Sequence, residues 1–159
     1  MQSQPLKLAS VSDEMVTEFL SGVAPEQVQF VMGHYFKHGT NYAFGMFDEN
    51  ENILGVIRYC KQFIGDEQKC ERITLNGSEL LEAKINAFAV SPDRRNQGIG
   101  RLLQKKVISH AKDQGCFQVA SYSTYDKVSN YAIKVSLGFA IQPELQSDGT
   151  RGCYFLMKL

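Results

Sequence analysis

Short apolar runs and longer amphipathic segments alternate along this 159-residue chain. The short runs end at turn-forming residues, whereas the longer segments repeat apolar residues at the spacing of a helix that buries one face. The short runs predict strands over residues 6–11, 42–47, 53–63, 84–90, 117–122 and 153–157, with an extra strand at 72–75 and a short one that ends at Ile141. The longer segments predict helices over about 12–20, 25–37 and 127–137, and one between Gly98 and Gly115.

Local signals mark the ends of the first two helices. Ser12 is a residue type that caps a helix N-terminus, and Pro25 is typical of a first helical turn. The helix that Pro25 opens is expected to run to about Lys37 and to stop at Gly39. Its apolar side would consist of Val28, Val31, Met32, Tyr35 and Phe36.

The order of the predicted elements indicates a mixed sheet. Residues 42–63 form a meander around the polar turn 48–52, and Asn76-Gly77 predicts a tight hairpin that leads into the strand ending at Val90. The strand–helix–strand pattern over residues 84–122 implies a parallel pair, because a crossover helix returns the chain in the same direction. We therefore expect an α/β (α+β) fold with one mixed central sheet of about seven strands flanked by helices, in a single domain over residues 1–159.

Charge and hydropathy narrow the classes of function. The 17 basic and 17 acidic residues balance, so the chain lacks the strongly basic character of a general nucleic-acid-binding protein. No apolar run approaches the length of a membrane span, and the first residues have neither the basic start nor the apolar core of a signal peptide. We expect a cytoplasmic protein that binds neither nucleic acid nor membrane.

Cysteine and histidine spacing predicts no metal site. The four cysteines, at positions 60, 70, 116 and 153, include no C-x-x-C pair, and we interpret them as reduced thiols. Cys60 and Cys116 lie in apolar runs, where cysteine behaves as a small buried hydrophobe. His34 and His38 stand four apart on the predicted second helix, a spacing that allows a metal or catalytic role and equally suits a solvated face or a helix cap.

The segment from Val90 to Arg101, VSPDRRNQGIGR, carries the chemical signal of the chain. It follows an apolar strand and opens an amphipathic helix. Gly98 and Gly100 let the backbone turn sharply and approach a ligand. The first turn of a helix has unpartnered N–H groups at its positive dipole end, so this turn is a candidate phosphate site with arginines at its rim.

The motif fits one phosphate-binding signature and not two others. The dinucleotide motif G-x-G-x-x-G fails because Leu103 holds the third glycine position, and no G-K-[ST] loop for ATP is present. The pattern R-x-x-G-x-G does occur, from Arg95 to Gly100, directly after a strand and a V-x-P exit, with Leu137-Gly138-Phe139 downstream. It resembles the pyrophosphate-binding signature of the GNAT acetyltransferases, and the element order resembles the full fold of that superfamily over nearly all of the chain.

The resemblance implies acetyl-CoA as co-substrate and a sheet in which the strand before the motif and the strand after its helix splay apart. Backbone groups of Phe88 and Val90 would hydrogen-bond the pantetheine amides in that gap, and backbone N–H groups from Gln97 to Arg101 would hold the pyrophosphate. The residues that the resemblance implies in cofactor binding are Phe88, Val90, Arg95, Gln97, Gly98, Ile99, Gly100 and Arg101.

The family's chemistry is direct attack of a neutral amine on the acetyl thioester in a ternary complex. It needs a route for the amine proton, an oxyanion donor such as a backbone N–H near Val90, and an acid for the thiolate. The family's tyrosine acid falls at position 134, here a lysine that we interpret as solvated. Tyr131, one turn earlier, is the predicted acid, and its spacing also suits a core residue.

Glu82 is the predicted base. Lys84 stands where relatives carry a glutamate, and Glu82 lies on the same face of the strand because side chains alternate with period two. The alternative interpretation of Glu82 is a polar residue at a strand start.

Three functions remain open at this stage. The favoured one is an acetyl-CoA-dependent N-acetyltransferase that acts on a small primary amine. The alternatives are a protein lysine or N-terminal acetyltransferase, and a CoA-binding sensor or interaction module that has lost catalysis. The predicted partner is a small-molecule amine or peptide acceptor, and a homodimer is left open.

Overall fold

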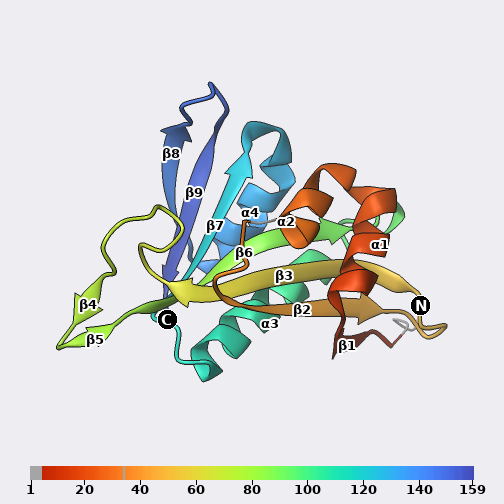
Figure 1. Cartoon of the computed structure of the whole chain (residues 1–159). Coiled ribbons are helices and arrows are strands. Elements are labelled where there is room, and N and C mark those ends of the chain that lie inside the picture. Colours follow the sequence, from red (N-terminus) through yellow and green to blue (C-terminus); the bar gives the residue numbers. More distant parts are fainter. Residues whose placement is uncertain (1–4, 34) are drawn as a thin grey trace.

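Seven strands form one twisted sheet in the computed structural model, which describes residues 5–33 and 35–159 (Figure 1). Their order across the sheet is β1-β2-β3-β6-β7-β9-β8. Neighbouring strands are antiparallel except for β6 and β7, which are parallel, so the predicted mixed sheet is confirmed. The strands are β1 (Lys7–Ser10), β2 (Thr40–Phe47), β3 (Ile53–Phe63), β6 (Leu81–Val90), β7 (Gln118–Thr124), β8 (Ala140–Leu145) and β9 (Arg151–Lys158).

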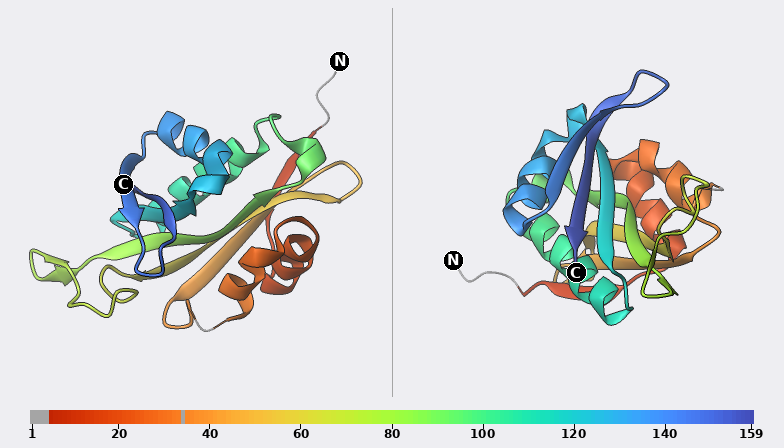
Figure 2. Two further views of the ribbon diagram at one scale, coloured as in Figure 1. Left: turned by 90° about the horizontal axis from the view of Figure 1, so that it is seen from above. Right: turned by 90° about the vertical axis from the view of Figure 1, so that its left-hand side faces the viewer.

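Helices cover both faces of the sheet, as the left view of Figure 2 shows. α1 (Asp13–Val23) and α2 (Val28–Met32) lie on one face, and α3 (Ile99–Asp113) and α4 (Val128–Leu137) lie on the other. Three short 3₁₀ turns precede helices or loops: η1 (Pro25–Gln27), η2 (Pro92–Arg94) and η3 (Tyr125–Lys127). The Ser12 hydroxyl accepts a hydrogen bond from the Met15 N–H and caps α1 as its sequence position predicts.

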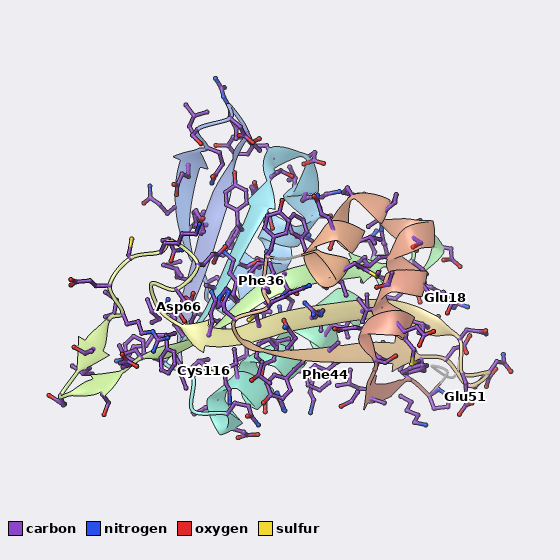
Figure 3. The ribbon with its side chains drawn as sticks, viewed as in Figure 1. Glu18, Phe36, Phe44, Glu51, Asp66 and Cys116 are labelled. Carbon is purple, nitrogen blue, oxygen red and sulfur yellow. The ribbon has the colours of Figure 1, made fainter. Side chains whose placement is uncertain are left out.

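The core consists of two clusters, one on each face of the sheet. Side chains alternate across β6, so Ala87 and Ala89 pack beneath α1 whereas Phe88 packs with α3. Val16 and Leu20 of α1 and Leu103 and Val107 of α3 are all fully buried. Phe44 and Cys116, labelled in Figure 3, belong to the α3 cluster. Both faces of the sheet are therefore covered by packed helices, and the central strands β3 and β6 are buried along most of their length.

The hairpin predicted from Asn76-Gly77 is confirmed. It joins β4 (Thr74–Leu75) to β5 (Ser78–Glu79), and both turn residues have positive φ, 51° and 81°, as a type I′ turn requires. The hairpin forms a small sheet of its own and projects from the end of β3 and β6 (Figure 1). The extra strand predicted at 72–75 thus does not join the main sheet.

The predicted second helix is shorter than expected. Instead of running from Pro25 to Lys37, the segment forms η1 and then α2, which ends at Met32. Met32 is 67% exposed and Tyr35 59% exposed, so they do not share an apolar side with Val28 and Val31. The Asn41 side chain binds the Phe36 carbonyl at 2.9 Å, and this contact with β2 holds the segment in a turn instead of a helix.

The histidine pair does not form the helical arrangement that the spacing allowed. His34 lies outside the described residues. His38 lies in a turn, and its Nε2 is 2.7 Å from the Gln62 Oε1. Gly39 does not end a helix; a β-carbon there would collide with Cys60 Sγ and the Lys61 carbonyl, so the position needs glycine for close approach to β3.

Several strands extend beyond their predicted ends because tertiary pairing continues past the apolar run. β6 begins at Leu81, which pairs with Phe63, and β8 continues to Leu145, opposite Arg151 of β9. Pro143 is tolerated within β8 because β8 is an edge strand, where one side needs no ladder hydrogen bond.

Candidate functional site

A gap opens in the sheet between β6 and β7. The two strands pair only from Glu82 to Ile85 on β6 and from Gln118 to Ser121 on β7. Beyond Ile85 the β3–β6 register shifts by one residue at Asn86, a bulge that bends β6 away from its parallel neighbour. Figure 1 shows β7, β9 and β8 turning away from β6 past this point.

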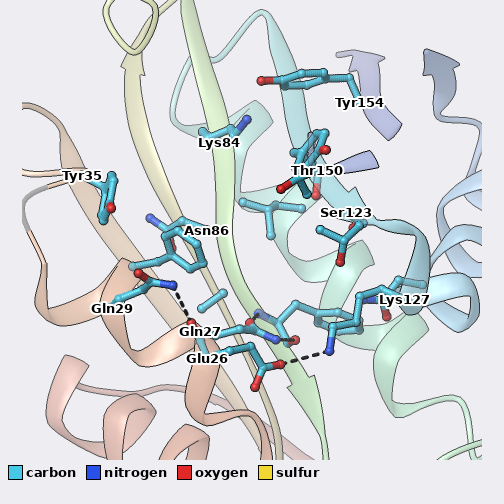
Figure 4. Close-up of a pocket in the computed structure, with 18 of the residues that line it drawn as sticks. Glu26, Gln27, Gln29, Tyr35, Lys84, Asn86, Ser123, Lys127, Thr150 and Tyr154 are labelled. Atoms are coloured by element: carbon cyan, nitrogen blue, oxygen red, sulfur yellow. Dashed lines mark hydrogen bonds and ion pairs between the residues drawn. The ribbon is translucent and has the colours of Figure 1, made fainter. Parts of the chain in front are cut away.

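The gap leads into a cavity of about 670 Å³. Its walls come from η1 and α2, from β6 and β7, from α4 and from the loop between β8 and β9 (Figure 4). This volume is in the range of small-molecule binding sites. Two of its lining residues carry buried polar atoms without a hydrogen-bond partner among the described residues, Asn86 Oδ1 and Tyr122 Oη. Both atoms are enclosed by their surroundings, and Tyr122 Oη lies beside Gly152 of β9.

The backbone of β6 presents hydrogen-bonding groups to this gap. The Phe88 N–H donates to Gln27 Oε1 at 2.8 Å, and the Phe88 carbonyl accepts from Gln27 Nε2 at 3.0 Å. Groups two residues apart on a strand point the same way, and the Val90 carbonyl accordingly accepts from Arg95 Nε at 3.3 Å, outside the β3 ladder. The backbone N–H and carbonyl of Phe88 therefore point away from β3, and the side-chain amide of Gln27 occupies both.

The glycine motif forms an open helix N-terminus. Gly98 caps α3 with φ +81°, a left-handed conformation that favours glycine, and no side chain caps the helix. A β-carbon on Gly98 would meet open space, so the turn is not covered by the rest of the protein. Gly100 is buried against Phe88 and Ile133, and a β-carbon there would lie only 3.0 Å from the Phe88 ring.

These features fit a diphosphate. The first backbone N–H groups of a helix lack intrahelical partners and lie at the positive end of its dipole, and in α3 they follow the exposed residues Gln97 and Gly98. Arg95 and Arg101 are exposed beside this turn, and Arg101 Nη1 donates to the Ser136 hydroxyl at 2.6 Å. The motif residues and the Phe88 backbone therefore lie along one continuous stretch from the end of β6 to the start of α3.

Lys134 of α4 is buried within the cavity wall, with 2% of its surface exposed. Its Nζ donates to the hydroxyls of Ser121 at 2.7 Å and Ser123 at 2.8 Å. Burial lowers the pKa of the Lys134 ammonium to about 7, with a further contribution from the positive charge of Lys84. Our interpretation of Lys134 as a solvated helix lysine is wrong, because the face of α4 that carries it packs against β7.

The two side chains predicted to be catalytic lie close to the cavity but not among its lining residues. The Tyr131 hydroxyl donates to the Ser123 carbonyl at 2.9 Å, and its ring packs on Phe155. Burial raises the pKa of Tyr131 above its ordinary value. Glu82 is 4% exposed, and its carboxylate accepts from Gln62 at 3.0 Å and from Gln118 at 2.9 Å. The catalytic assignment of these two residues stays a prediction.

Ion pairs surround the cavity. Glu26 and Lys127 meet at 3.0 Å across its two sides (Figure 4), and this contact lowers the pKa of Glu26 and raises that of Lys127. Lys84 Nζ lies 3.5 Å from Glu67 and over the Tyr154 ring. The charges on the rim thus compensate one another, and the fully buried Lys134 has no carboxylate among its hydrogen-bond partners in the described structure.

The described residues were expected to hold neither a metal ion nor a disulfide, and their arrangement bears on metal ligands, thiols and membrane-spanning helices. They contain no group of three or more histidine, cysteine or acidic residues that would hold a metal ion. All four cysteines are free, and Cys60 and Cys116 are buried as predicted. The described helices include none long and apolar enough to cross a bilayer.

One family model and several solved structures match this chain. The model of the acetyltransferase (GNAT) family matches residues 9–139. No curated protein sequence matches the chain. Among solved structures, NAA60 of Arabidopsis thaliana in complex with acetyl-CoA superposes with a TM-score of 0.74 at 12% identity, covering 98% of this chain and 99% of that one.

Two bacterial structures are also similar. A protein described as an IAA acetyltransferase from Bacillus cereus has a TM-score of 0.68 at 14% identity, covering 98% of this chain and all of the other. Mutant forms of the spermidine/spermine N-acetyltransferase SpeG from Vibrio cholerae have a TM-score of 0.63 at 8% identity, covering 96% of this chain and 93% of that one. At these identities the likeness concerns the fold.

Proposed function

Because the chain belongs to the GNAT acetyltransferase family, we propose that it is an acetyl-CoA-dependent N-acetyltransferase that acts on a small primary amine. The observation that carries this proposal is a continuous path along the chain. It runs from the Phe88 backbone, which lines the cavity and binds the Gln27 amide, to the uncapped glycine turn at the start of α3. A pantetheine arm with a diphosphate at its far end has the chemistry that this arrangement selects.

The roles of the chain's residues follow from their position. Phe88 and Val90 would offer backbone groups to the pantetheine amides. The backbone N–H groups of Gln97, Gly98, Ile99, Gly100 and Arg101 would hold the diphosphate, with the Arg95 and Arg101 side chains adding positive charge. Acetyl-CoA supplies the activated acetyl group when it is bound. The Phe88 side chain packs in the core, and its backbone groups become available to a ligand once the Gln27 amide leaves them.

A small acceptor fits the cavity better than a large one. Helices η1 and α2 and the β8–β9 loop wall the cavity on opposite sides, and Glu26 and Lys127 join across it. A small amine can enter with this ion pair closed, whereas a larger acceptor would have to displace it.

The test is a panel of acceptors offered to the purified protein with acetyl-CoA. The panel contains small primary amines, amino acids, and peptides with a free N-terminus or a lysine. Because Cys70 is exposed and would react with thiol reagents, acetylated product is measured by mass spectrometry. Turnover of a small amine supports the proposal, and turnover of peptides alone would assign a protein acceptor.

Binding of acetyl-CoA is measured in parallel by calorimetry. A protein that binds acetyl-CoA and acetylates none of the acceptors would contradict the proposed enzyme and support a CoA-binding sensor. A protein that fails to bind acetyl-CoA would contradict both.

A further inference from the structure

Lys134 forms, with Ser121 and Ser123, a buried cluster that the acetyltransferase chemistry proposed above leaves without a task. Its ammonium has three N–H donors, of which two point at the serine hydroxyls at 2.7 and 2.8 Å. Each serine oxygen that accepts from lysine keeps its own O–H proton free to donate. All three residues line the cavity. In its charged form, the cluster therefore offers the third N–H of the ammonium and two serine O–H groups as hydrogen-bond donors to whatever occupies the cavity.

The Lys134 ammonium and the two serine hydroxyls can bind an anion, because they offer hydrogen-bond donors and a positive charge that no carboxylate of the described residues neutralises. No carboxylate is a hydrogen-bond partner of Lys134 in the described structure; its other neighbours are the Phe155 ring, at 4.7 Å, and the cationic Lys84 of β6. A buried charge without a partner is costly, so loss of a proton to an anion would relieve that cost. The anion that amine acetylation produces is the leaving thiolate.

We propose that Lys134 is the proton donor to the leaving thiolate in this protein, held in place by Ser121 and Ser123. This role rests on the proposed function. The acceptor nitrogen forms a bond to the acetyl carbon, the carbon–sulfur bond breaks, and its electron pair stays on sulfur. A proton moves from Lys134 Nζ to that sulfur. The proton lost by the acceptor nitrogen, or one from solvent, restores the ammonium, so charge and protons balance over one turnover.

The acidity of Lys134 matches the task. An ordinary lysine, with a pKa of about 10.4, would give its proton reluctantly to a thiolate whose conjugate acid has a pKa of about 8.5. Burial brings the pKa of Lys134 to about 7, so transfer to such a thiolate is downhill. Tyr131 is a poorer candidate because burial raises its pKa and its hydroxyl proton is bound to the Ser123 carbonyl.

The titratable and charged groups around the cluster come from four elements. Lys84 lies on β6 and pairs with Glu67, Cys153 lies on β9, and Tyr131 lies on α4 itself. β7 contributes the serine hydroxyls and the Tyr122 ring. Of these groups, Lys84 is the one that acts on the pKa of Lys134, and it lowers it.

The test compares Lys134→Met with Tyr131→Phe. Methionine keeps the volume of the buried chain and removes the amine, so we expect kcat to fall about 10²- to 10⁴-fold while the Kd for acetyl-CoA from calorimetry stays within about 3-fold. Wild-type kcat should pass through a maximum and fall above a pH of about 7, as the ammonium loses its proton. That falling limb should vanish in Lys134→Met and remain in Tyr131→Phe.

A readout independent of turnover is the proton equilibrium of Lys134 in protein whose lysines carry ¹³C at Cε. The signal absent from Lys134→Met should titrate near pH 7 in wild type. Ser123→Ala removes an acceptor that stabilises the ammonium, so the midpoint and the falling limb of kcat should both move to lower pH. This shared shift is a result that a purely structural lysine would not give.

Three results would overturn the role. The first is a Lys134→Met enzyme as active as wild type, which leaves the proposed function intact. The second is a Tyr131→Phe enzyme that alone loses turnover, which transfers the role to Tyr131. The third is a Lys134 signal that titrates near pH 10. A wild type that acetylates no amine would overturn the proposed function and this role together.

Discussion

Replacing Gln27 with alanine is expected to tighten acetyl-CoA binding. In the structure the Gln27 amide makes two hydrogen bonds to Phe88, of 2.8 and 3.0 Å, and so occupies the backbone N–H and carbonyl proposed for pantetheine. A ligand must break both bonds before it can use those groups. Each bond contributes about 0.5–1.5 kcal/mol net, so removing the competitor should favour the ligand by about 1–3 kcal/mol, or about 5- to 150-fold in Kd.

The assay is calorimetry with acetyl-CoA, and Gln29→Ala is the matched control. Gln29 also lines the cavity and comes from the same short helical segment, but its side chain donates to the Glu26 carbonyl and does not touch Phe88. Gln29→Ala should bind acetyl-CoA like wild type. The ligand-free Gln27→Ala protein should unfold at a lower urea concentration, because it lacks two native hydrogen bonds.

Unchanged or weaker acetyl-CoA binding by Gln27→Ala would refute the reasoning. It would mean that the Phe88 backbone is not part of the binding path, or that Gln27 itself contacts the ligand. The urea measurement shows whether the premise holds. If Gln27→Ala is as stable as wild type, the wild-type protein does not form the two Gln27–Phe88 hydrogen bonds.

Three further predictions test the site and the fold. Gly98→Glu should abolish acetyl-CoA binding in calorimetry by placing a charged side chain in the open turn of α3. Gly77 on the β4–β5 hairpin has the same φ of +81° and equally open surroundings, so Gly77→Glu should lose a similar amount of stability and still bind acetyl-CoA. Loss of acetyl-CoA binding in both variants would contradict the phosphate site at α3. Deleting residues 151–159 removes β9 from between β7 and β8 together with the fully buried Phe155, so the circular dichroism melt should show no cooperative transition, and native-like melting would contradict the topology. The folded Lys134 ammonium has a pKa of about 7 against about 10.4 unfolded, so the unfolded chain binds more protons between these values. The free energy of unfolding of wild type, relative to that of Lys134→Met, should therefore rise by about 1.4 kcal/mol per pH unit between about pH 7 and pH 10. A difference between the two proteins that does not vary with pH would refute the lowered pKa.

Local sequence determined most of the elements. The cap at Ser12, the hairpin at Asn76-Gly77 and the left-handed turns at Gly98 and Gly138 each depend on residues within one or two turns of the chain. The crossover between β6 and β7 follows from the strand–helix–strand order. The motif after Val90 predicts a diphosphate cradle, because Gly98 allows the left-handed turn before α3 and Gly100 leaves room for the Phe88 ring.

Sequence periodicity failed where a tertiary contact outweighed a local preference. The apolar spacing from Val28 to Phe36 suits a helix, but Asn41 binds the Phe36 carbonyl from β2 and a turn forms instead. Strands β6, β8 and β9 run past their apolar residues because a neighbouring strand continues to pair with them.

The environments of the polar side chains in and near the cavity depend on tertiary structure alone. Gln27 reaches Phe88 across 61 positions, and the sequence around either residue carries no sign of the contact. A lysine on a short amphipathic helix is normally solvated, yet the packing of α4 on β7 buries Lys134 between two serines. Hydrogen bonds to Gln62 and Gln118 satisfy the Glu82 carboxylate within the sheet. Local sequence sets backbone conformation within a few residues, whereas the environment of a side chain, and with it its pKa and its reactivity, depends on which distant elements pack around it.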